Sequence, residues 1–184
     1  MGPMPHAPTR ALAALAFVFV LASAARPAAA QAPTLTSVRA MLSGYESVPT
    51  LAEWRRQGAG TLDLLKRLFE ASDTQPYVRL RAVAAMAAFP TDAARSFLVR
   101  VARSSTSDLI AREALLTLGR AFGDGVRAEL APFLSHRIPL LREAAARALG
   151  RIGNPDCRAL LEARLETEGH PAVREAVTRA LAAG

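Results

Sequence analysis

Apolar residues recur with helical spacing in four similar segments of the chain, which begin at Val78, Ile110, Leu141 and Val173. In the first and third segments they fall at offsets 0, 4, 7, 8 and 11, which trace one face of a helix with 3.6 residues per turn. The four starting positions are 32, 31 and 32 residues apart, a period typical of solenoid repeats. The pattern therefore predicts a row of similar units, each burying one stripe of this helix.

Each of these helices is preceded by residues that favour a helix start. Proline, which costs no hydrogen bond in the first turn, stands two residues before three of them: Pro76, Pro139 and Pro171. The remaining helix has Asp108 in this place, which we predict to be its N-cap. An earlier helix in each of the last three units is expected to open at Thr91, Gly123 and Asn154. Three glycines are interpreted as turns between units: Gly119, Gly150 and Gly153.

A shared run of residues marks the second helix of the units. Val or Leu followed by Arg-x-x-Ala-x-x-Ala-Leu-Gly comes after a short turn with Asp and Pro, and residues 139–153 give the fullest match. This pattern resembles the HEAT repeat, in the short form similar to that of phycobilisome lyases. The resemblance covers residues 60–184 and implies an all-α fold, an α-solenoid of about four stacked HEAT-like helix pairs. The units span approximately residues 60–90, 91–122, 123–153 and 154–184.

The resemblance also implies a ladder of turn acids and second-helix arginines that ties neighbouring turns. The residues at these two places are, unit by unit, Asp73 and Arg79, Ser105 and Ala111, His136 and Arg142, and Glu168 and Arg174. Two units lack the acid, so we expect an incomplete ladder. The stack then depends mainly on apolar packing between units.

Residues 1–30 are predicted to be a secretory signal peptide that is removed. Arg10 supplies a positive charge, residues 11–25 form an uncharged apolar run, and three alanines at 28–30 provide small residues for cleavage. The run is shorter than the roughly 20 apolar residues of a membrane-spanning helix. We therefore expect a periplasmic or secreted protein with no membrane span after cleavage; a retained anchor is the alternative.

The two ends of the repeat array are expected to have atypical faces. Residues 31–59 fit the repeat poorly and are predicted to form an irregular helical N-terminal cap, with short helices over 35–42 and 51–56. We expect Trp54 to cover the open end of the first unit. In the last unit, four apolar residues either form an exposed contact edge or need no cover: Leu160, Leu161, Val177 and Leu181.

Composition narrows the class of protein. The 184 residues are 51% hydrophobic and 21% charged, which is typical of a globular chain and excludes a disordered tail. One cysteine excludes an internal disulfide, Fe–S clusters and zinc sites built on several thiolates. Cys157 follows a helix start, where a reactive thiol is conceivable. Because the equivalent residues Ala94 and Val126 are apolar, we predict that Cys157 is a buried, inert filler.

The remaining candidates for chemistry are two histidines in turns of neighbouring units. His136 and His170 suggest a metal shared with Glu168, but their offsets differ and only one carboxylate accompanies them. We predict solvated turn residues and no metal site. No Gly-rich phosphate loop, GxSxG or HExxH sequence occurs in the chain. The sequence therefore predicts no cofactor and no enzyme.

One column of residues stands out on the second helices. Offsets 2, 6 and 10 face away from the apolar stripe, and the HEAT resemblance places these helices on the inner, concave surface. We interpret nine residues there as a candidate partner-binding face: Leu80, Arg112, Leu116, Arg120, Glu143, Arg147, Arg151, Glu175 and Arg179. The planar guanidinium group of arginine binds carboxylates and phosphates through paired hydrogen bonds. The alternative is a solvated face in which Glu143 and Glu175 pair with the arginines four residues later.

Three functions are compatible with these features. The leading one is an exported, noncatalytic protein–protein interaction scaffold that binds an unidentified, possibly acidic, partner protein or peptide on its concave face. The second is a binder of an anionic polymer, either an acidic glycan or a nucleic acid. Removal of the leader, which holds Arg10 and Arg26 and no acid, lowers the formal charge from +7 to +5, which disfavours nucleic acid. The third, an enzyme subunit such as a bilin lyase, rests on family analogy alone.

Overall fold

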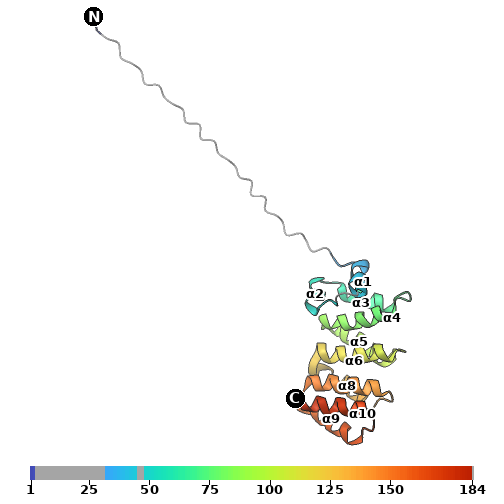
Figure 1. The fold of residues 1–184 in the computed structure, drawn as a ribbon. Helices are drawn as coiled ribbons and strands as arrows, with labels where there is room; N and C mark the ends of the chain where they lie inside the picture. The colour runs from blue at the N-terminus through green and yellow to red at the C-terminus, as the bar shows by residue number, and fades with distance from the viewer. Residues whose placement is uncertain (3–31, 45–47, 184) are drawn as a thin grey trace. The chain divides into compact units, whose positions relative to one another are not determined.

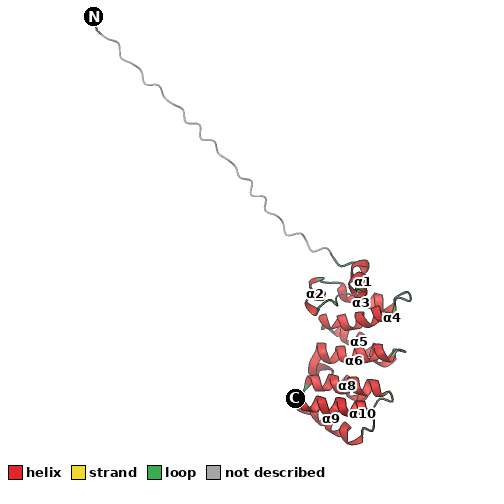
Figure 2. Ribbon diagram, in the orientation of Figure 1, coloured by secondary structure: helices red, strands yellow, loops and turns green. Residues whose placement is uncertain are grey.

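The fold is built from helices stacked in a row. The computed structural model describes residues 1–2, 32–44 and 48–183, which form helices and connecting loops with no strand among them (Figures 1 and 2). Apart from residues 1–2, the predicted signal peptide at 1–30 lies outside this described part of the chain. No described helix has the length and apolar character needed to cross a membrane. The predicted α-solenoid of HEAT-like helix pairs is confirmed.

Two layers of helices make up the four pairs. The first helices are α3 (Thr61–Glu70), α5 (Asp92–Ser104), a broken segment in the third unit and α9 (Pro155–Thr167). The second helices are α4 (Pro76–Ala85), extended by the 3-10 turn η1 (Met86–Ala88), then α6 (Asp108–Phe122), α8 (Pro139–Ile152) and α10 (Pro171–Ala182). Second helices of neighbouring units pack directly on one another, whereas first helices contact each other little. The second-helix layer is therefore the tighter, inner side of the stack.

The helices begin largely where their sequence signals predict. Pro76, Pro139 and Pro171 each open a second helix. The Thr91 hydroxyl accepts a hydrogen bond from Ala94 N at 3.2 Å, and Asn154 Oδ1 accepts one from Cys157 N at 2.8 Å. The prediction for Asp108 was wrong by one residue. Ser107 is the N-cap, and Asp108 lies in the first turn, where its charge still favours the helix dipole.

The first helix of the third unit is not continuous as the apolar pattern suggested. It is divided into η2 (Gly123–Val126), α7 (Arg127–Leu130) and η3 (Ala131–Ser135). Pro132 lies within this segment and has no N–H to donate to the preceding turn, so the α-helix gives way to 3-10 geometry. The break leaves Leu130, Phe133 and Leu134 buried, so the unit still closes its core.

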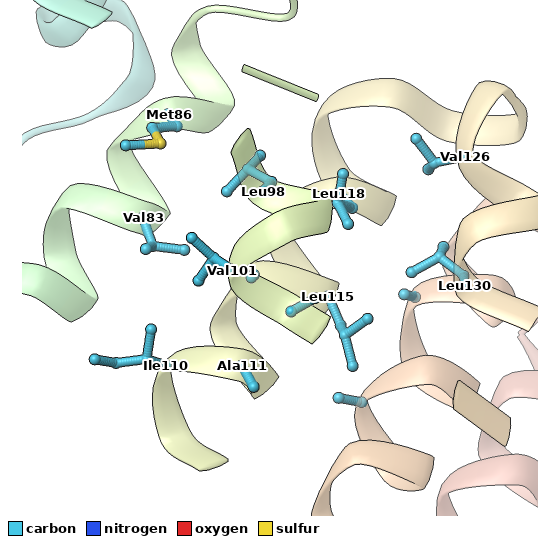
Figure 3. Packing of buried hydrophobic residues seen from close by; sticks show 14 of the residues in the cluster. Val83, Met86, Leu98, Val101, Ile110, Ala111, Leu115, Leu118, Val126 and Leu130 are labelled. Carbon is cyan, nitrogen blue, oxygen red and sulfur yellow. The ribbon is translucent and has the colours of Figure 1, made fainter. Parts of the chain in front are cut away.

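Apolar side chains from both layers form one continuous core. Figure 3 shows Val83 lying opposite Val101 of α5, and Leu115 and Leu118 of α6 lying between the second and third units. Met86, Leu98 and Leu115 are fully buried. Each such side chain contributes about 1.5–3 kcal/mol through removal from water. Packing of this kind between units supplies the main stabilisation of the stack.

Two glycines predicted as turns lie instead inside helices. Gly119 in α6 and Gly150 in α8 sit where second helices of adjacent units approach closely. A Cβ on Gly119 would lie 3.0 Å from Ala148 Cα, and one on Gly150 would lie 2.9 Å from Ala180 Cα. These residues therefore permit contact between backbones rather than a turn. Only Gly153, with φ of 69° at the C-cap of α8, ends a helix as predicted.

At both ends of the array, large apolar side chains are buried or partly buried. The cap contains α1 (Leu35–Ser43) and α2 (Leu51–Arg56), close to the predicted helices, and Trp54 is buried beside the first unit as expected. In the last unit Leu161 and Val177 are buried, while Leu160 and Leu181 are partly buried. All four side chains belong to the core or pack against it. They do not form an exposed apolar edge.

Candidate functional site

The nine predicted partner-binding residues all lie on the four second helices, and we call them the second-helix face. Leu80, Arg112, Leu116 and Glu143 are partly buried. The other five are exposed: Arg120, Arg147, Arg151, Glu175 and Arg179. Because neighbouring second helices pack in direct contact, the nine residues form a contiguous strip with three more arginines than glutamates. This strip is an electropositive surface of the solenoid.

A hollow between α6 and α8 brings four of these residues together. It has a volume of about 200 Å³ and is lined by Leu116, Arg120, Arg147, Ala148 and Arg151. Three guanidinium groups therefore surround a small apolar floor. Planar guanidinium forks bind carboxylates with two parallel hydrogen bonds, so the hollow has the chemistry to hold an acidic side chain. Leu80 and Arg179 lie outside it.

The ion pairs of the second-helix face join residues of the same helix and are at least partly exposed. Glu143 pairs with Arg147 at 3.4 Å and Glu175 with Arg179 at 3.3 Å, as their spacing predicts. Pairs of this kind contribute less than about 1 kcal/mol each. Within the part of the chain that the structure describes, Arg112 and Arg151 have no ion pair or hydrogen bond at all. The face thus combines helix-supporting pairs with free cations.

An apolar pocket that the sequence pattern did not predict adjoins this face. It measures about 230 Å³ and lies between the cap and α4, with Leu42, Leu51, Trp54 and Ala84 in its wall. Arg120 lines both this pocket and the arginine hollow, so the two features are neighbours. The Arg120 guanidinium donates to Ala84 O at 3.4 Å and pairs with Glu113 at 3.5 Å. The pocket depends on the way the cap packs on α4, which no local pattern encodes.

The turn acids form a partial ladder that ties neighbouring units, as the resemblance implies. Glu168 pairs with Arg142 of the preceding unit, at 2.8 and 2.9 Å, rather than with Arg174. It also accepts hydrogen bonds from Arg164 and from His170 N. In the same way Asp73 pairs with Arg39 of the cap at 3.2 Å. Each acid therefore ties its turn to the unit before it.

Glu168 is the most strongly perturbed acid of the described residues. Its side chain is 1% exposed. The hydrogen bonds from Arg142, from the His170 backbone and from Arg164 outweigh burial and lower its pKa to about 2. Two guanidinium groups occupy this carboxylate, so its role is to hold the third and fourth units together. It is not placed to share a metal with the histidines.

The other residues considered for metal binding or catalysis lie in purely structural environments. His136 accepts a hydrogen bond from Ile138 N at 3.2 Å and stacks on Phe133. The described residues contain no group of three or more His, Cys, Asp or Glu side chains arranged to hold a metal ion. Cys157 is fully buried, and burial raises the pKa of its thiol. The prediction of a buried filler at this position is confirmed.

Comparison with known proteins agrees with this architecture. Residues 101–182 match a family model described as HEAT repeats. The matched segment covers α6, α8, α9 and α10 and includes the arginine hollow. No curated protein matches the sequence.

Proposed function

We propose that this chain, a HEAT repeat protein, binds an acidic, extended segment of a partner protein on its second-helix face. HEAT repeats commonly serve as noncatalytic scaffolds for protein–protein interactions. The observation that carries the proposal is the arginine hollow and the apolar pocket that share Arg120. A surface with one apolar cavity next to three arginines, of which Arg151 has no ion pair among the described residues, suits a peptide with an apolar anchor and nearby acids.

The spacing of the two cavities defines the expected peptide. The apolar pocket lies against α4 and the arginine hollow lies between α6 and α8, so they are about one and a half interhelical spacings, or about 12–15 Å, apart. An extended chain covers this distance in about four residues. We therefore expect an apolar residue followed or preceded, about four residues away, by Asp or Glu.

The proposal includes export. The apolar run at 11–25 and the alanines at 28–30 support a periplasmic or secreted location, where the scaffold would meet its partner. N-terminal sequencing of the protein recovered outside the cytoplasm is expected to begin near residue 31. Recovery of the protein only from the cytoplasm with its leader intact would contradict this part of the proposal.

Selection of peptides on the purified protein tests the proposed chemistry. Phage-displayed random peptides are expected to converge on sequences with one large apolar residue and acids about four positions away. Synthetic versions should bind at least about tenfold more weakly to the variant Arg147→Glu/Arg151→Glu, because each reversal replaces an attraction with a repulsion. The matched control is Arg103→Glu/Arg137→Glu, which reverses two exposed arginines away from both cavities. Equal losses in both variants, or peptides without acids, would refute the proposal.

The arginine-rich strip also supports a second candidate, the binder of an anionic polymer. Glu113, Glu143 and Glu175 are interleaved with the arginines, so we expect only weak retention on heparin, with elution at low salt. Retention to high salt that is lost in Arg147→Glu/Arg151→Glu would favour the polymer instead of a peptide.

A further inference from the structure

The boundary between the third and fourth units shows a complete inter-unit clamp. Arg142 on α8 uses one part of its guanidinium group to donate to His136 O, at 2.9 Å, in its own turn. Its Nε and Nη2 atoms donate to the two carboxylate oxygens of Glu168 in the next unit. The carboxylate also accepts from His170 N at 2.8 Å. The clamp therefore needs an arginine, a carboxylate and a backbone N–H two residues beyond the acid.

The boundary between the first and second units has the same parts except the carboxylate. Arg79 occupies the place of Arg142 and donates to Ala71 O, at 2.7 Å, in its own turn. Ser105 occupies the place of Glu168, and its hydroxyl accepts from Ser107 N at 3.1 Å, as the carboxylate does from His170 N. The serine has no hydrogen bond to Arg79. The Nε atom of Arg79 is consequently buried without any hydrogen-bond partner.

This unpaired donor is specific to one boundary. At the next boundary His136 replaces the acid, but Ala111 also replaces the arginine, so no guanidinium group is left without a partner there. A buried donor without an acceptor is destabilising, and native proteins rarely keep one. Within the chain Arg79 donates to Ala71 O and Ser72 O at the end of α3, but no group there accepts from its Nε atom. An acceptor from outside the chain would pair with this atom.

A hollow in front of Arg79 has room for such an acceptor. It measures about 410 Å³, and its lining includes Arg79, Arg100, Ser105, Thr106 and Ser107. Arg100 is paired with Glu70 at 3.0 Å and lies 4.6 Å from the centre of the Phe97 ring, so its charge is partly neutralised. Arg79 has no such acidic partner among the described residues. We call this space the Arg79 hollow.

We propose that the Arg79 hollow is a carboxylate-binding site, in which a carboxylate from outside the chain takes the place that Glu168 fills in the last clamp. Its two oxygens would accept from the Arg79 guanidinium group, and the hydroxyl groups of Thr106 and Ser107, which line the same hollow, would be further donors. The planar fork of arginine favours a carboxylate over a spherical anion such as chloride. The carboxylate belongs either to a small free acid or to an acidic side chain of a partner.

The site is independent of the second-helix face, so its test is separate. The ¹⁵N-labelled full-length protein is titrated at constant ionic strength with sodium glutarate and, separately, with acetyl-Gly-Glu-Gly-amide. The NMR signal of Arg79 Nε–Hε, identified by its loss in Arg79→Lys, reports binding. We expect a saturable shift of this signal with at least one probe, and no weakening of it in Arg147→Glu/Arg151→Glu.

A variant that fills the hollow from within supplies the decisive control. Ser105→Glu places a carboxylate where Glu168 stands in the last clamp, so it should raise Tm by about 2–4 °C and weaken binding of either probe at least tenfold. Ser105→Ala, which leaves the hollow open, should retain the binding. Tighter binding of glutarate identifies a free acid and tighter binding of the peptide identifies a partner side chain; both support the site. Absence of a saturable shift with both probes, or an unchanged shift in Ser105→Glu, would overturn the proposal.

Discussion

Replacement of Glu168 by alanine is expected to lower the free energy of unfolding by about 3–5 kcal/mol. The side chain of Glu168 is 1% exposed, and those of Arg142 and Arg164 are 13% and 17% exposed. Removal of the carboxylate leaves two largely buried guanidinium groups without their counter-charge and also frees His170 N. Since the clamp joins the third and fourth units, we expect the last helix pair to be the first part of the stack to open.

Urea denaturation followed by circular dichroism measures this effect. The matched control is Glu166→Ala, which removes an exposed acid from the last turn of α9, two residues before Glu168, and should change stability by less than about 0.5 kcal/mol. A loss below about 1 kcal/mol for Glu168→Ala would show that the clamp contributes no more than a surface ion pair.

The same residue makes stability depend on pH in a defined direction. The pKa of Glu168 is about 2 in the folded protein, against an ordinary value of 4.5. The unfolded chain therefore binds the proton more readily, and the contribution of Glu168, about 3 kcal/mol, is present above pH 4.5 and is lost as pH falls toward 2. The loss of stability between pH 6 and pH 3 should be smaller in Glu168→Ala than in the wild type. Identical pH profiles would contradict the assignment.

Replacement of Gly150 by alanine is expected to destabilise the protein by about 1–3 kcal/mol. The direction is opposite to that of helix propensity, which favours alanine over glycine by about 1 kcal/mol within a helix. The reason is contact between units, because a Cβ on Gly150 would lie 2.9 Å from the Cα of Ala180 on α10. The new methyl group must push α8 and α10 apart along a buried interface.

Gly125→Ala is the matched control for this effect. No atom lies within 4 Å of the Cβ that would be added at Gly125. We expect its stability to stay within about 0.5 kcal/mol of the wild type. Thermal and urea denaturation of both variants distinguish the cases, and a stabilised Gly150→Ala protein would show that the two helices can separate at no cost.

The periodicity of apolar residues predicted the helices well because every unit buries the same apolar stripe of its second helix. The apolar offsets after Val78 and Leu141 correspond to the buried stripes of α4 and α8, and the prolines at 76, 139 and 171 correspond to the first residues of their helices. Local signals were sufficient there, since a helix start depends on a few adjacent residues. The two helices of the N-terminal cap were also predicted from local sequence signals.

Features that depend on contacts between units were not predictable in the same way. Gly150 was interpreted as a turn because glycine often ends a helix, whereas its role depends on how close Ala180 lies. The register of the ladder, in which Glu168 reaches back to Arg142, depends on the offset between adjacent units. The column of arginines could be aligned from the sequence, but the apolar pocket beside Arg120 required the packing of the cap.

The central claim is that the second-helix face binds an acidic segment of a partner protein. Crosslinking of the full-length protein in its own extract, followed by mass spectrometry, tests it most directly. We predict a stoichiometric partner whose crosslinked peptides are rich in Asp and Glu and map to α6 and α8, and which is lost in Arg147→Glu/Arg151→Glu but retained in Arg103→Glu/Arg137→Glu. Crosslinks confined to the first helices α3, α5 and α9, or a partner retained after reversal of Arg147 and Arg151, would contradict the account.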